Sequence, residues 1–512
     1  MNIDKVVLIN LPVDGKVADF YTPKYAIEDF SAYPPLGLLY VATGIKESYP
    51  VKIIDVLGKK YDIKMSVIKV LEEKPAVLGI SCQTFYLYPM VAIIEQVKKH
   101  LPDLVVVVGG PHVTAFPSET LRLPGVDYCI QGDGDRCFKM LLDALKDDDH
   151  SRFREIPGLI YQDDNGEIKK NSPEVLKLGD VPICDRSLID KNDYFTVADE
   201  GREVVTMISS RGCPFKCVFC DVLEKKYRSR EAELIVDEME HILKTFDNPI
   251  IHIFDDTFNL NKKRVMDMCQ EIIDRGLKVC WTTRTRAKPL DDEMVRLMKE
   301  SGCRRMHFGV ESGSPTSLKL IKKGLCREDI VRAFELCKKH EVQALAYFII
   351  GFEWETTKEI EETIDFIKQI EPSFIMANTL YPAAKTTTYE TLLKNGILKK
   401  DYWQEYAETP TRDFRLPDYL NEKSLRYLRR KLDEIYMTFY LSPRFVINNL
   451  MESRKSTANA RKGNGLGYKI NMAKKIVSSY LKNTVLELTT SGVNQFKQPL
   501  VMIEDQSSNI SQ

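Results

Sequence analysis

Apolar runs and amphipathic stretches alternate along the first 145 residues of the chain. Strands are predicted at the apolar runs 6–11, 51–55, 76–81, 104–108 and 128–130. A strand that helices cover on both faces needs a continuous apolar run, as at 104–108. Between them, helical stretches such as 89–100 place Val91, Ile94 and Val97 on one face. This pattern predicts a doubly wound α/β domain over residues 1–145.

Residues 146–195 break this alternation. An acidic run at 147–149 predicts a solvated loop, and Asp164-Asn165-Gly166 is a strong turn signal between two short apolar runs. We therefore expect a linker that carries a small β-hairpin unit.

The alternation resumes over residues 196–400. Apolar runs at 204–208, 250–254, 278–283, 305–310, 344–350 and 374–379 are each followed by a helical pattern, as where Ile360, Ile364 and Ile367 share one face. Six such units are too few for a closed eight-stranded barrel, so they predict a partial, open (β/α)6 barrel. Residues 401–512 predict a helical region that ends in a polar tail.

Composition narrows the class of protein. With 44% hydrophobic and 29% charged residues among 512, wholesale disorder is excluded. The net charge of -1 offers no electrostatic case for nucleic acid as the main partner. No apolar run approaches the ~20 residues of a transmembrane helix, and the N-terminus predicts a strand and not a signal peptide. Twelve cysteines without a secretory signal argue against a disulfide framework and for the cytoplasm.

Three of these cysteines share one loop. Cys213, Cys217 and Cys220 directly follow the first strand of the second α/β region at the spacing CxxxCxxC. Such a loop can wrap one face of an iron–sulfur cube, and three thiolates leave one iron without a protein ligand. A structural zinc site is the alternative, but zinc needs a fourth ligand and the nearest downstream candidate, His241, lies far along the next helix.

On these residues the chain resembles the radical S-adenosylmethionine (SAM) superfamily, and more narrowly its branch with an N-terminal cobalamin (B12)-binding domain, over residues 4–400. The resemblance implies that Cys213, Cys217 and Cys220 hold a 4Fe–4S cluster whose open iron chelates SAM. Reductive cleavage of SAM then yields a 5'-deoxyadenosyl radical. Phe219 matches the aromatic residue that usually lies near the adenine.

Further segments match the SAM-binding motifs of this family. Acidic residues follow the second strand, an arginine follows the third, and a Gly-x-Glu-Ser-Gly sequence ends the fourth. A helix cap is the alternative both for the acidic residues and for Glu311 and Ser312. Arg284 competes with Arg286 for the arginine position. The SAM-binding residues implied by the resemblance are Phe219, Asp255, Asp256, Arg286, Glu311 and Ser312.

The chain departs from the family after its fifth and sixth strands. The common Gly-x-Pro-Gly-Glu-Thr reads Gly351-Phe352-Glu353-Trp354-Glu355-Thr356 here, and Ala384-Lys385-Thr386 replaces a Pro-Gly-Thr motif. Both loops are expected at the substrate end of the barrel, so Glu353, Trp354 and Lys385 are candidate substrate residues. Neutral drift in surface loops is the alternative.

Three segments of the N-terminal region, 31–37, 109–112 and 132–135, resemble the cobalamin-binding domains of this branch. Their small residues let the backbone approach a flat corrin ring. The Asp-x-His-x-x-Gly motif is absent after Asp55, so no histidine from that loop is expected to ligate cobalt. His112 could be a cobalt ligand, but in this turn a structural role or a corrin contact is favoured. A vestigial domain without cofactor is the alternative to cobalamin binding. The candidate cobalamin-binding residues are Pro35, Leu36, Gly37, Cys82, Gln83, Thr84, Gly109, Gly110, His112, Gly132 and Asp133.

The resemblance implies an enzyme that takes a 4Fe–4S cluster, SAM and cobalamin and methylates an unactivated carbon of a biosynthetic intermediate. A radical rearrangement, cyclisation or oxidation without methyl transfer is a second hypothesis, and a non-catalytic cobalamin or cluster sensor is a third. Expected partners are a small-molecule or peptide substrate and an electron donor such as flavodoxin or ferredoxin. The remaining cysteines are interpreted as core thiols.

Overall fold

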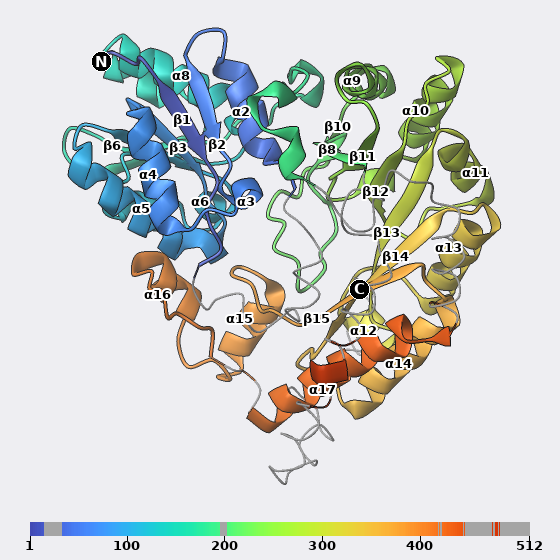
Figure 1. Ribbon diagram of the computed structural model, residues 1–512. Coiled ribbons are helices and arrows are strands. Elements are labelled where there is room, and N and C mark those ends of the chain that lie inside the picture. Colours follow the sequence, from blue (N-terminus) through green and yellow to red (C-terminus); the bar gives the residue numbers. More distant parts are fainter. Residues whose placement is uncertain are drawn as a thin grey trace, which may run out of the picture.

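A computed structural model describes residues 1–14, 33–194, 202–417 and 422–443, with isolated positions 419, 445, 474, 477–479 and 481. The polar tail predicted at 505–512 lies outside the described residues, as do Ser31 and Ala32 of the segment 31–37. Two α/β bodies lie side by side, and the C-terminal helices run beneath both (Figure 1). No helix in the described part of the chain is long and apolar enough to cross a membrane.

The N-terminal sheet has the strand order β2-β1-β3-β4-β5-β6-β7, and β1 to β5 are parallel. All four residues of β1 are buried, as expected for a strand covered on both faces. The order reverses between β1 and β3, and ligands bind at such switch points beside the carboxyl ends of the strands. The strands are β1 (Val6–Ile9), β2 (Val51–Ile54), β3 (Val77–Ser81), β4 (Val105–Gly109), β5 (Tyr128–Ile130), β6 (Leu159–Gln162) and β7 (Ile168–Lys170).

Helices cover both faces of this sheet (Figure 1). The helices are α2 (Leu36–Ile45), α3 (Val56–Lys59), α4 (Ile63–Glu73), α5 (Leu87–His100), α6 (Pro111–Ala115), α7 (Pro117–Arg122) and α8 (Gly134–Lys146). Short 3-10 turns are η1 (Thr84–Tyr86), η2 (His150–Glu155), η3 (Leu178–Asp180), η4 (Arg186–Leu188) and η5 (Lys191–Asp193).

The predicted hairpin around Asp164-Asn165-Gly166 is present, but it does not form a unit of its own. Its strands β6 and β7 extend the N-terminal sheet, because β6 pairs antiparallel with β5 through Cys129 and Ile130. The expected linker therefore contributes its hairpin to the first body.

The second sheet has six parallel strands in the order β15-β14-β13-β12-β11-β8. Neighbours in sequence are neighbours in space, and the sheet curls into the predicted half-barrel, with β8 and β15 at its open edges (Figure 1). The strands are β8 (Glu203–Met207), β11 (Pro249–Ile253), β12 (Trp281–Thr285), β13 (Cys303–Glu311), β14 (Gln343–Ile350) and β15 (Phe374–Thr379), with a small separate pair, β9 (Ser210–Arg211) and β10 (Arg228–Ser229).

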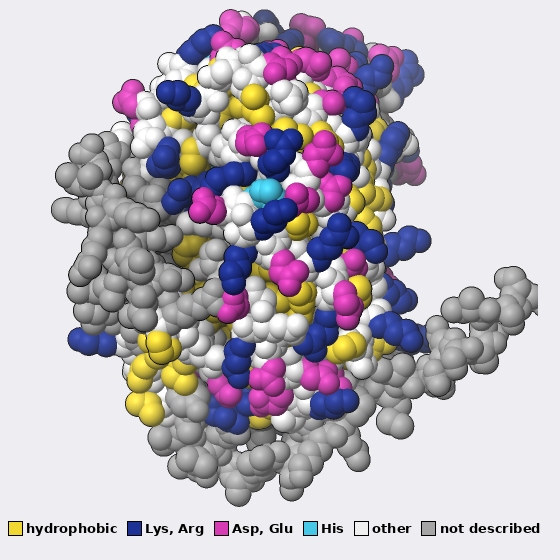
Figure 2. Space-filling view, turned by 90° about the vertical axis from the view of Figure 1, so that its right-hand side faces the viewer, with side chains coloured by type: hydrophobic (Ala, Val, Ile, Leu, Met, Phe, Trp, Pro, Cys, Tyr) yellow, Lys and Arg dark blue, Asp and Glu magenta, His cyan; other side chains and the backbone are white. Residues whose placement is uncertain are grey.

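Outer helices begin at polar caps. The Asp291 side chain accepts from the Met294 N–H at the start of α11, and Thr356 and Glu359 form a capping box on α14. On the face formed by α10, α11 and α13, acidic and basic side chains are interspersed without a patch of one sign (Figure 2). The helices are α9 (Ala232–Thr245), α10 (Lys262–Asp274), α11 (Asp292–Glu300), α12 (Pro315–Leu320), α13 (Arg327–Lys339), α14 (Thr357–Ile370) and α15 (Thr387–Lys394), with the 3-10 turn η7 (Phe258–Leu260).

The C-terminal helices α16 (Tyr402–Glu408) and α17 (Glu422–Tyr440) take different places. Helix α17 lies along the open edge at β15, where the Tyr436 hydroxyl donates to the Ala377 carbonyl at 3.0 Å and the Tyr440 hydroxyl donates to the Ile375 carbonyl at 2.8 Å. Helix α16 packs against α7 of the first body, and Gln404 donates to Glu119 at 2.8 Å. One helix thus covers an exposed strand edge, and the other joins the two bodies.

Candidate functional site

The cysteine loop is a hairpin closed by β9 and β10. Arg211 pairs directly with Arg228, and the three cysteines lie between them. Gly212 has φ +80, and a Cβ there would lie 2.4 Å from the Lys226 carbonyl oxygen, so the turn into Cys213 requires glycine. In the middle of the loop, the Val218 N–H donates to the Ile321 carbonyl at 3.1 Å. The loop is therefore held at its ends and at its centre.

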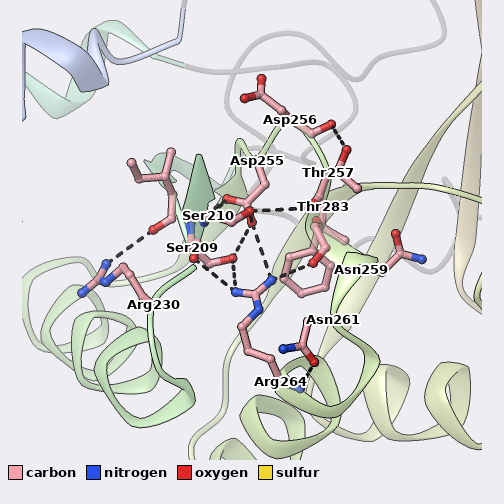
Figure 3. A network of polar contacts seen from close by, with 12 residues as sticks. Ser209, Ser210, Arg230, Asp255, Asp256, Thr257, Asn259, Asn261, Arg264 and Thr283 are labelled. Carbon is pink, nitrogen blue, oxygen red and sulfur yellow. Dashed lines mark hydrogen bonds and ion pairs between the residues drawn. The ribbon is translucent and has the colours of Figure 1, made fainter. Parts of the chain in front are cut away.

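Asp255 anchors the start of this loop. Its carboxylate accepts from the backbone N–H groups of Ser209 and Ser210, at 2.7 and 2.9 Å, and from their hydroxyls, at 2.5 and 2.6 Å (Figure 3). Arg264 lies behind it and donates to the Ser209 hydroxyl at 2.8 Å. Asp255 is fully buried. Because its oxygens are already occupied, its role as a SAM ligand stays a prediction, and its observed contacts are those of an anchor.

Asp256 is the more available carboxylate of the pair. It accepts one hydrogen bond, from the Gly212 N–H at 3.0 Å, and it lines a cavity between the two bodies. Burial raises the pKa of its carboxyl above the usual range. The neighbouring Thr257 hydroxyl lies 3.1 Å from the Cys213 sulfur. The acidic segment thus contacts the cysteine loop at two points.

Two cations lie beside the cysteines. Burial raises the pKa of the Cys217 thiol, and the charges of Lys323 and Arg286 oppose that rise. The Arg286 guanidinium stacks 3.5 Å from the centroid of the Phe215 ring and donates to the Lys323 carbonyl. Lys323 pairs with Glu311 at 2.5 Å. Two sequence-predicted SAM residues, Arg286 and Glu311, therefore lie together at the cysteine loop.

These donors fit a cluster bound on one face. The three thiols are partly exposed, whereas seven other cysteines of the described chain are buried. No group of three or more described His, Cys, Asp or Glu side chains is arranged around a single metal ion. In a 4Fe–4S cluster each of the three cysteines binds a different iron. Their sulfurs can therefore lie farther apart than the ligands of a single metal ion.

A second part of the site is a cavity of about 420 Å³ between the two bodies. It lies at the carboxyl ends of β1, β3, β4 and β5, which is the switch-point edge of the N-terminal sheet. Its floor is apolar, and its rim includes Ser210, Arg211 and Asp256 from the second body. Of the predicted cobalamin residues, the cavity is lined by Leu36, Gly37, Gly109, Gly110, Gly132 and Asp133.

Gly110 follows β4 and is required by the turn at this edge. It has φ +100, and a Cβ there would lie 2.7 Å from the Cys82 carbonyl oxygen. Gly37 and Gly109 line the same edge, and a Cβ at either would meet no atom closer than 3.7 Å, so the open backbone there fits a flat group such as a corrin ring.

The other predicted cobalamin residues are not among those that line this cavity. Cys82 is buried and its backbone supports the turn at Gly109-Gly110, while Thr84 hydrogen-bonds His112 Nδ1 at 3.1 Å. His112 is fully buried, and burial lowers the pKa of its imidazole to about 4. These contacts are those of a structural residue, and a cobalamin contact of His112 stays a prediction. Cobalamin contacts of Pro35, Cys82, Gln83 and Thr84 stay predictions.

An ion-pair bridge joins the cysteine loop to the cavity rim. The Arg211 guanidinium contacts Asp133 at 2.6 Å and Asp135 at 2.8 and 3.0 Å, and Arg228 contacts Asp133 at 2.6 Å. Arg211 and Arg228 lie opposite each other on paired strands, where like charges repel. The two carboxylates at the start of α8 neutralise them. We call these four residues the Arg211 bridge.

A third part of the site is a cavity of about 450 Å³ inside the half-barrel. Phe254 lines both this cavity and the one between the bodies, so the two adjoin. Tyr33, from the first body, packs edge-on against Phe254 with ring centroids 4.8 Å apart. The strands contribute His252, Thr282, Thr283, Arg284, His307, Gly309, Glu311, Tyr347, Phe348, Ile349, Met376 and Asn378.

Several predicted residues face away from this cavity. Ser312 is fully buried and bonds the Thr363 hydroxyl at 3.0 Å. Trp354 stacks on Phe352 at 4.8 Å, and Phe352 contacts Phe219 edge-on at 6.0 Å, so Trp354 supports the aromatic residue beside Cys220. A substrate role for Trp354 and a SAM role for Ser312 stay predictions.

Glu353 and Lys385 also do not line the half-barrel cavity. Glu353 is buried, its Oε2 accepts no hydrogen bond from a described residue, and burial raises the pKa of its carboxyl to about 7. Lys385 reaches the first body, where its ammonium lies 4.5 Å from the centroid of the Phe116 ring. Their substrate roles stay predictions.

Comparison with known proteins agrees with this geometry. A B12 binding domain model matches residues 26–142, and a radical SAM superfamily model matches residues 207–367. The chain is 33% identical over 430 residues to an uncharacterized methyltransferase of Pyrococcus horikoshii, covering 82% of this chain and 90% of the relative. The chain belongs to the radical SAM superfamily. The resemblance that the sequence motifs indicated, including the B12-binding branch, is confirmed.

Other relatives of this radical SAM protein extend the comparison. An anaerobic magnesium-protoporphyrin IX monomethyl ester cyclase of Rubrivivax gelatinosus is 26% identical over 359 residues, 68% of this chain and 63% of the relative. The methyltransferase TsrM of Kitasatospora setae has a TM-score of 0.60 at 19% identity, covering 78% of this chain and 79% of TsrM. The cobalamin-dependent enzyme OxsB has a TM-score of 0.64 at 18% identity, covering 98% of this chain and 83% of OxsB. These structures confirm the fold. The matched families imply a 4Fe–4S cluster, SAM and cobalamin as cofactors.

Sequence reasoning missed four residues of the radical SAM site: Arg211, Asp135, Tyr33 and Lys323. Arg211 precedes the cysteine motif and Asp135 follows Gly132-Asp133-Gly134, so adjacency to each motif was the available signal. Tyr33 lies in the segment 31–37, which resembles a cobalamin-domain segment, whereas Lys323 carried no such signal. The core-thiol interpretation is wrong for Cys326, which is exposed at the N-terminus of α13.

Proposed function

We propose that the chain is a cobalamin-dependent radical SAM methyltransferase that adds a methyl group to an unactivated carbon. The adjoining cavities carry this proposal. A substrate in the half-barrel would lie beside the cysteine loop on one side and, across Phe254, beside the cavity that fits cobalamin. Methyl transfer needs both cofactors near one carbon atom, and this arrangement provides that.

When bound, the cluster with SAM supplies a radical that removes hydrogen, and cobalamin supplies the methyl group. The chain positions these groups. Cys213, Cys217 and Cys220 would hold the cluster, while Arg286 and the Lys323–Glu311 pair would bind the charged and polar groups of SAM. Phe254 and Tyr33 would exclude water between the cavities.

Cyclisation or oxidation without methyl transfer is the second candidate, because the similar Rubrivivax gelatinosus protein is named a cyclase. Product mass separates the two candidates. A gain of one methylene group supports methyl transfer, and an unchanged or two-hydrogen-lighter skeleton supports the alternative.

The radical chemistry is tested with anaerobically reconstituted protein, reduced with dithionite in the presence of SAM. We expect 5'-deoxyadenosine from the wild type and none from Cys217→Ala. Cys326→Ala is the matched control, because that thiol is exposed and lies outside the site. Cleavage of SAM that survives Cys217→Ala would contradict the proposal.

The proposal extends to partners and compartment. The substrate would be a small molecule or peptide, and flavodoxin or ferredoxin would supply the electron. An iron with an open coordination position is sensitive to oxygen, so we propose a reducing cytoplasm as the location.

A further inference from the structure

The half-barrel cavity contains a positive charge without a paired carboxylate. Arg284 lies on β12 and lines the cavity, and its guanidinium carbon lies 4.5 Å from the centroid of the Phe254 ring. Asp256 is near enough for this charge to oppose the rise in the pKa of its carboxyl. The two form no ion pair, and no other described carboxylate pairs with Arg284. A guanidinium that lines a cavity without a partner suits an anionic ligand.

The rest of the lining mixes polar side chains, among them His252, His307 and Glu311, with apolar ones. Asn378 lines the cavity, and its Oδ1 accepts no hydrogen bond from any described residue. Phe254, Phe348 and Met376 provide apolar walls. A ligand that fits both surfaces would present an anion, a hydrogen-bond donor and an apolar body.

SAM does not account for the Arg284 charge. Arg286 is the arginine at the cysteine loop: its guanidinium lies 3.5 Å from the centroid of the Phe215 ring and donates to the Lys323 carbonyl. Arg284 instead stacks on Phe254, the side chain shared with the cavity between the bodies. The two arginines therefore lie in different parts of the site: Arg286 at the cysteine loop and Arg284 in the half-barrel cavity.

We propose that the substrate carries a carboxylate or phosphate group that binds Arg284 inside the half-barrel. This inference rests on the proposed function, which makes this cavity the substrate site. The planar guanidinium binds either oxyanion through two parallel hydrogen bonds. The apolar body of the substrate packs against Phe254 and Phe348, and a donor group faces Asn378. The anchored anion places the body beside Phe254, between the two cofactor sites.

The test uses reconstituted holoenzyme saturated with SAM, so that the groups at the cysteine loop are occupied. Benzoate and phenyl phosphate are the carboxylate and phosphate probes, and neutral benzamide is their uncharged counterpart. Affinities are measured by calorimetry for the wild type, Arg284→Gln and Arg284→Lys. The matched control is Arg296→Gln, since Arg296 is a solvent-exposed arginine on α11 that pairs with Glu300 at 2.8 Å.

We expect at least one anion to bind the wild type more tightly than benzamide does. Arg284→Gln should weaken anion binding about 10- to 100-fold, the loss expected for a charge-assisted hydrogen bond, and leave benzamide binding unchanged. Arg284→Lys should retain part of the affinity. The stronger of the two probes identifies the anion class.

Two results would overturn this assignment. In the first, both anions bind no more tightly than benzamide, or bind Arg284→Gln as well as the wild type. In the second, Arg284→Gln weakens binding of SAM but not of decarboxylated SAM, which would assign Arg284 to the SAM carboxylate. Neither result depends on methyl transfer, so failure of the proposed function remains separately visible in the cleavage assay.

Discussion

Replacing Arg211 with glutamine tests whether the Arg211 bridge holds the cysteine loop against the first body. The substitution keeps a polar side chain but removes the charge that contacts Asp133 and Asp135. Arg228 still neutralises Asp133, at 2.6 Å, whereas Asp135 loses its partner.

The burial of these groups sets the magnitude. The Arg211 side chain is 19% exposed and those of Asp133 and Asp135 are 10% exposed. Removing one member of a buried ion pair costs about 3–5 kcal/mol, and partial solvent contact puts our expectation at the low end, about 3 kcal/mol. For a cooperative unit of about 150–250 residues this lowers Tm by about 6–12 °C.

Thermal and urea unfolding measure this loss. A double-mutant cycle with Asp135→Asn should show a coupling of about 2 kcal/mol, because the second change removes the unpaired charge left by the first. Arg136→Gln is the control on the same helix, since the Arg136 side chain is 61% exposed and its ion pair with Glu174 should contribute about 0.5 kcal/mol or less. Equal effects of Arg211→Gln and Arg136→Gln, or a coupling near zero, would refute the bridge.

Three further predictions address other parts of the site. Because the pKa of Glu353 is raised to about 7, the folded state binds its proton more tightly, and stability falls as pH rises from about 4.5 to about 7. In urea unfolding, the free energy of unfolding of Glu353→Gln should therefore exceed that of the wild type by up to about 3 kcal/mol at pH 8 and equal it below pH 4.5. A difference that does not depend on pH would contradict this. Gly110→Ala should weaken hydroxocobalamin binding in an absorbance titration, because its Cβ meets the Cys82 carbonyl, whereas Gly166→Ala, at a positive φ in an open turn, should not. Asp255→Asn should reduce iron per chain after reconstitution, because an amide cannot accept four hydrogen bonds from Ser209 and Ser210; unchanged iron would show that the loop needs no such anchor.

The sequence predicts the parts of this molecule that depend on local pattern. Apolar runs such as 6–11 and 204–208 lie close to β1 and β8, because parallel strands buried on both faces need continuous apolar residues. The cysteine motif was recognisable because its three thiols lie within one turn of chain.

Contacts between distant segments were not predictable in this way. Asp255 and Asp256 are adjacent, and only the fold shows that the first anchors Ser209 and Ser210 while the second lines a cavity. The hairpin strand β6 joined the first sheet because β5 offered a free edge, which no local signal records. Arg211 lies far in sequence from Asp133 and Asp135, so their bridge required the packing of two bodies.

The central claim is that this chain transfers a methyl group with cobalamin and a SAM-derived radical. Its most direct test is the yield of S-adenosylhomocysteine and 5'-deoxyadenosine from SAM and reduced protein that carries the reconstituted cluster, with and without added cobalamin. A methyl group taken from SAM leaves S-adenosylhomocysteine, and radical formation leaves 5'-deoxyadenosine. We predict both products with cobalamin and loss of S-adenosylhomocysteine without it. 5'-Deoxyadenosine alone under both conditions would contradict methyl transfer. The absence of both products would contradict radical SAM catalysis by this chain.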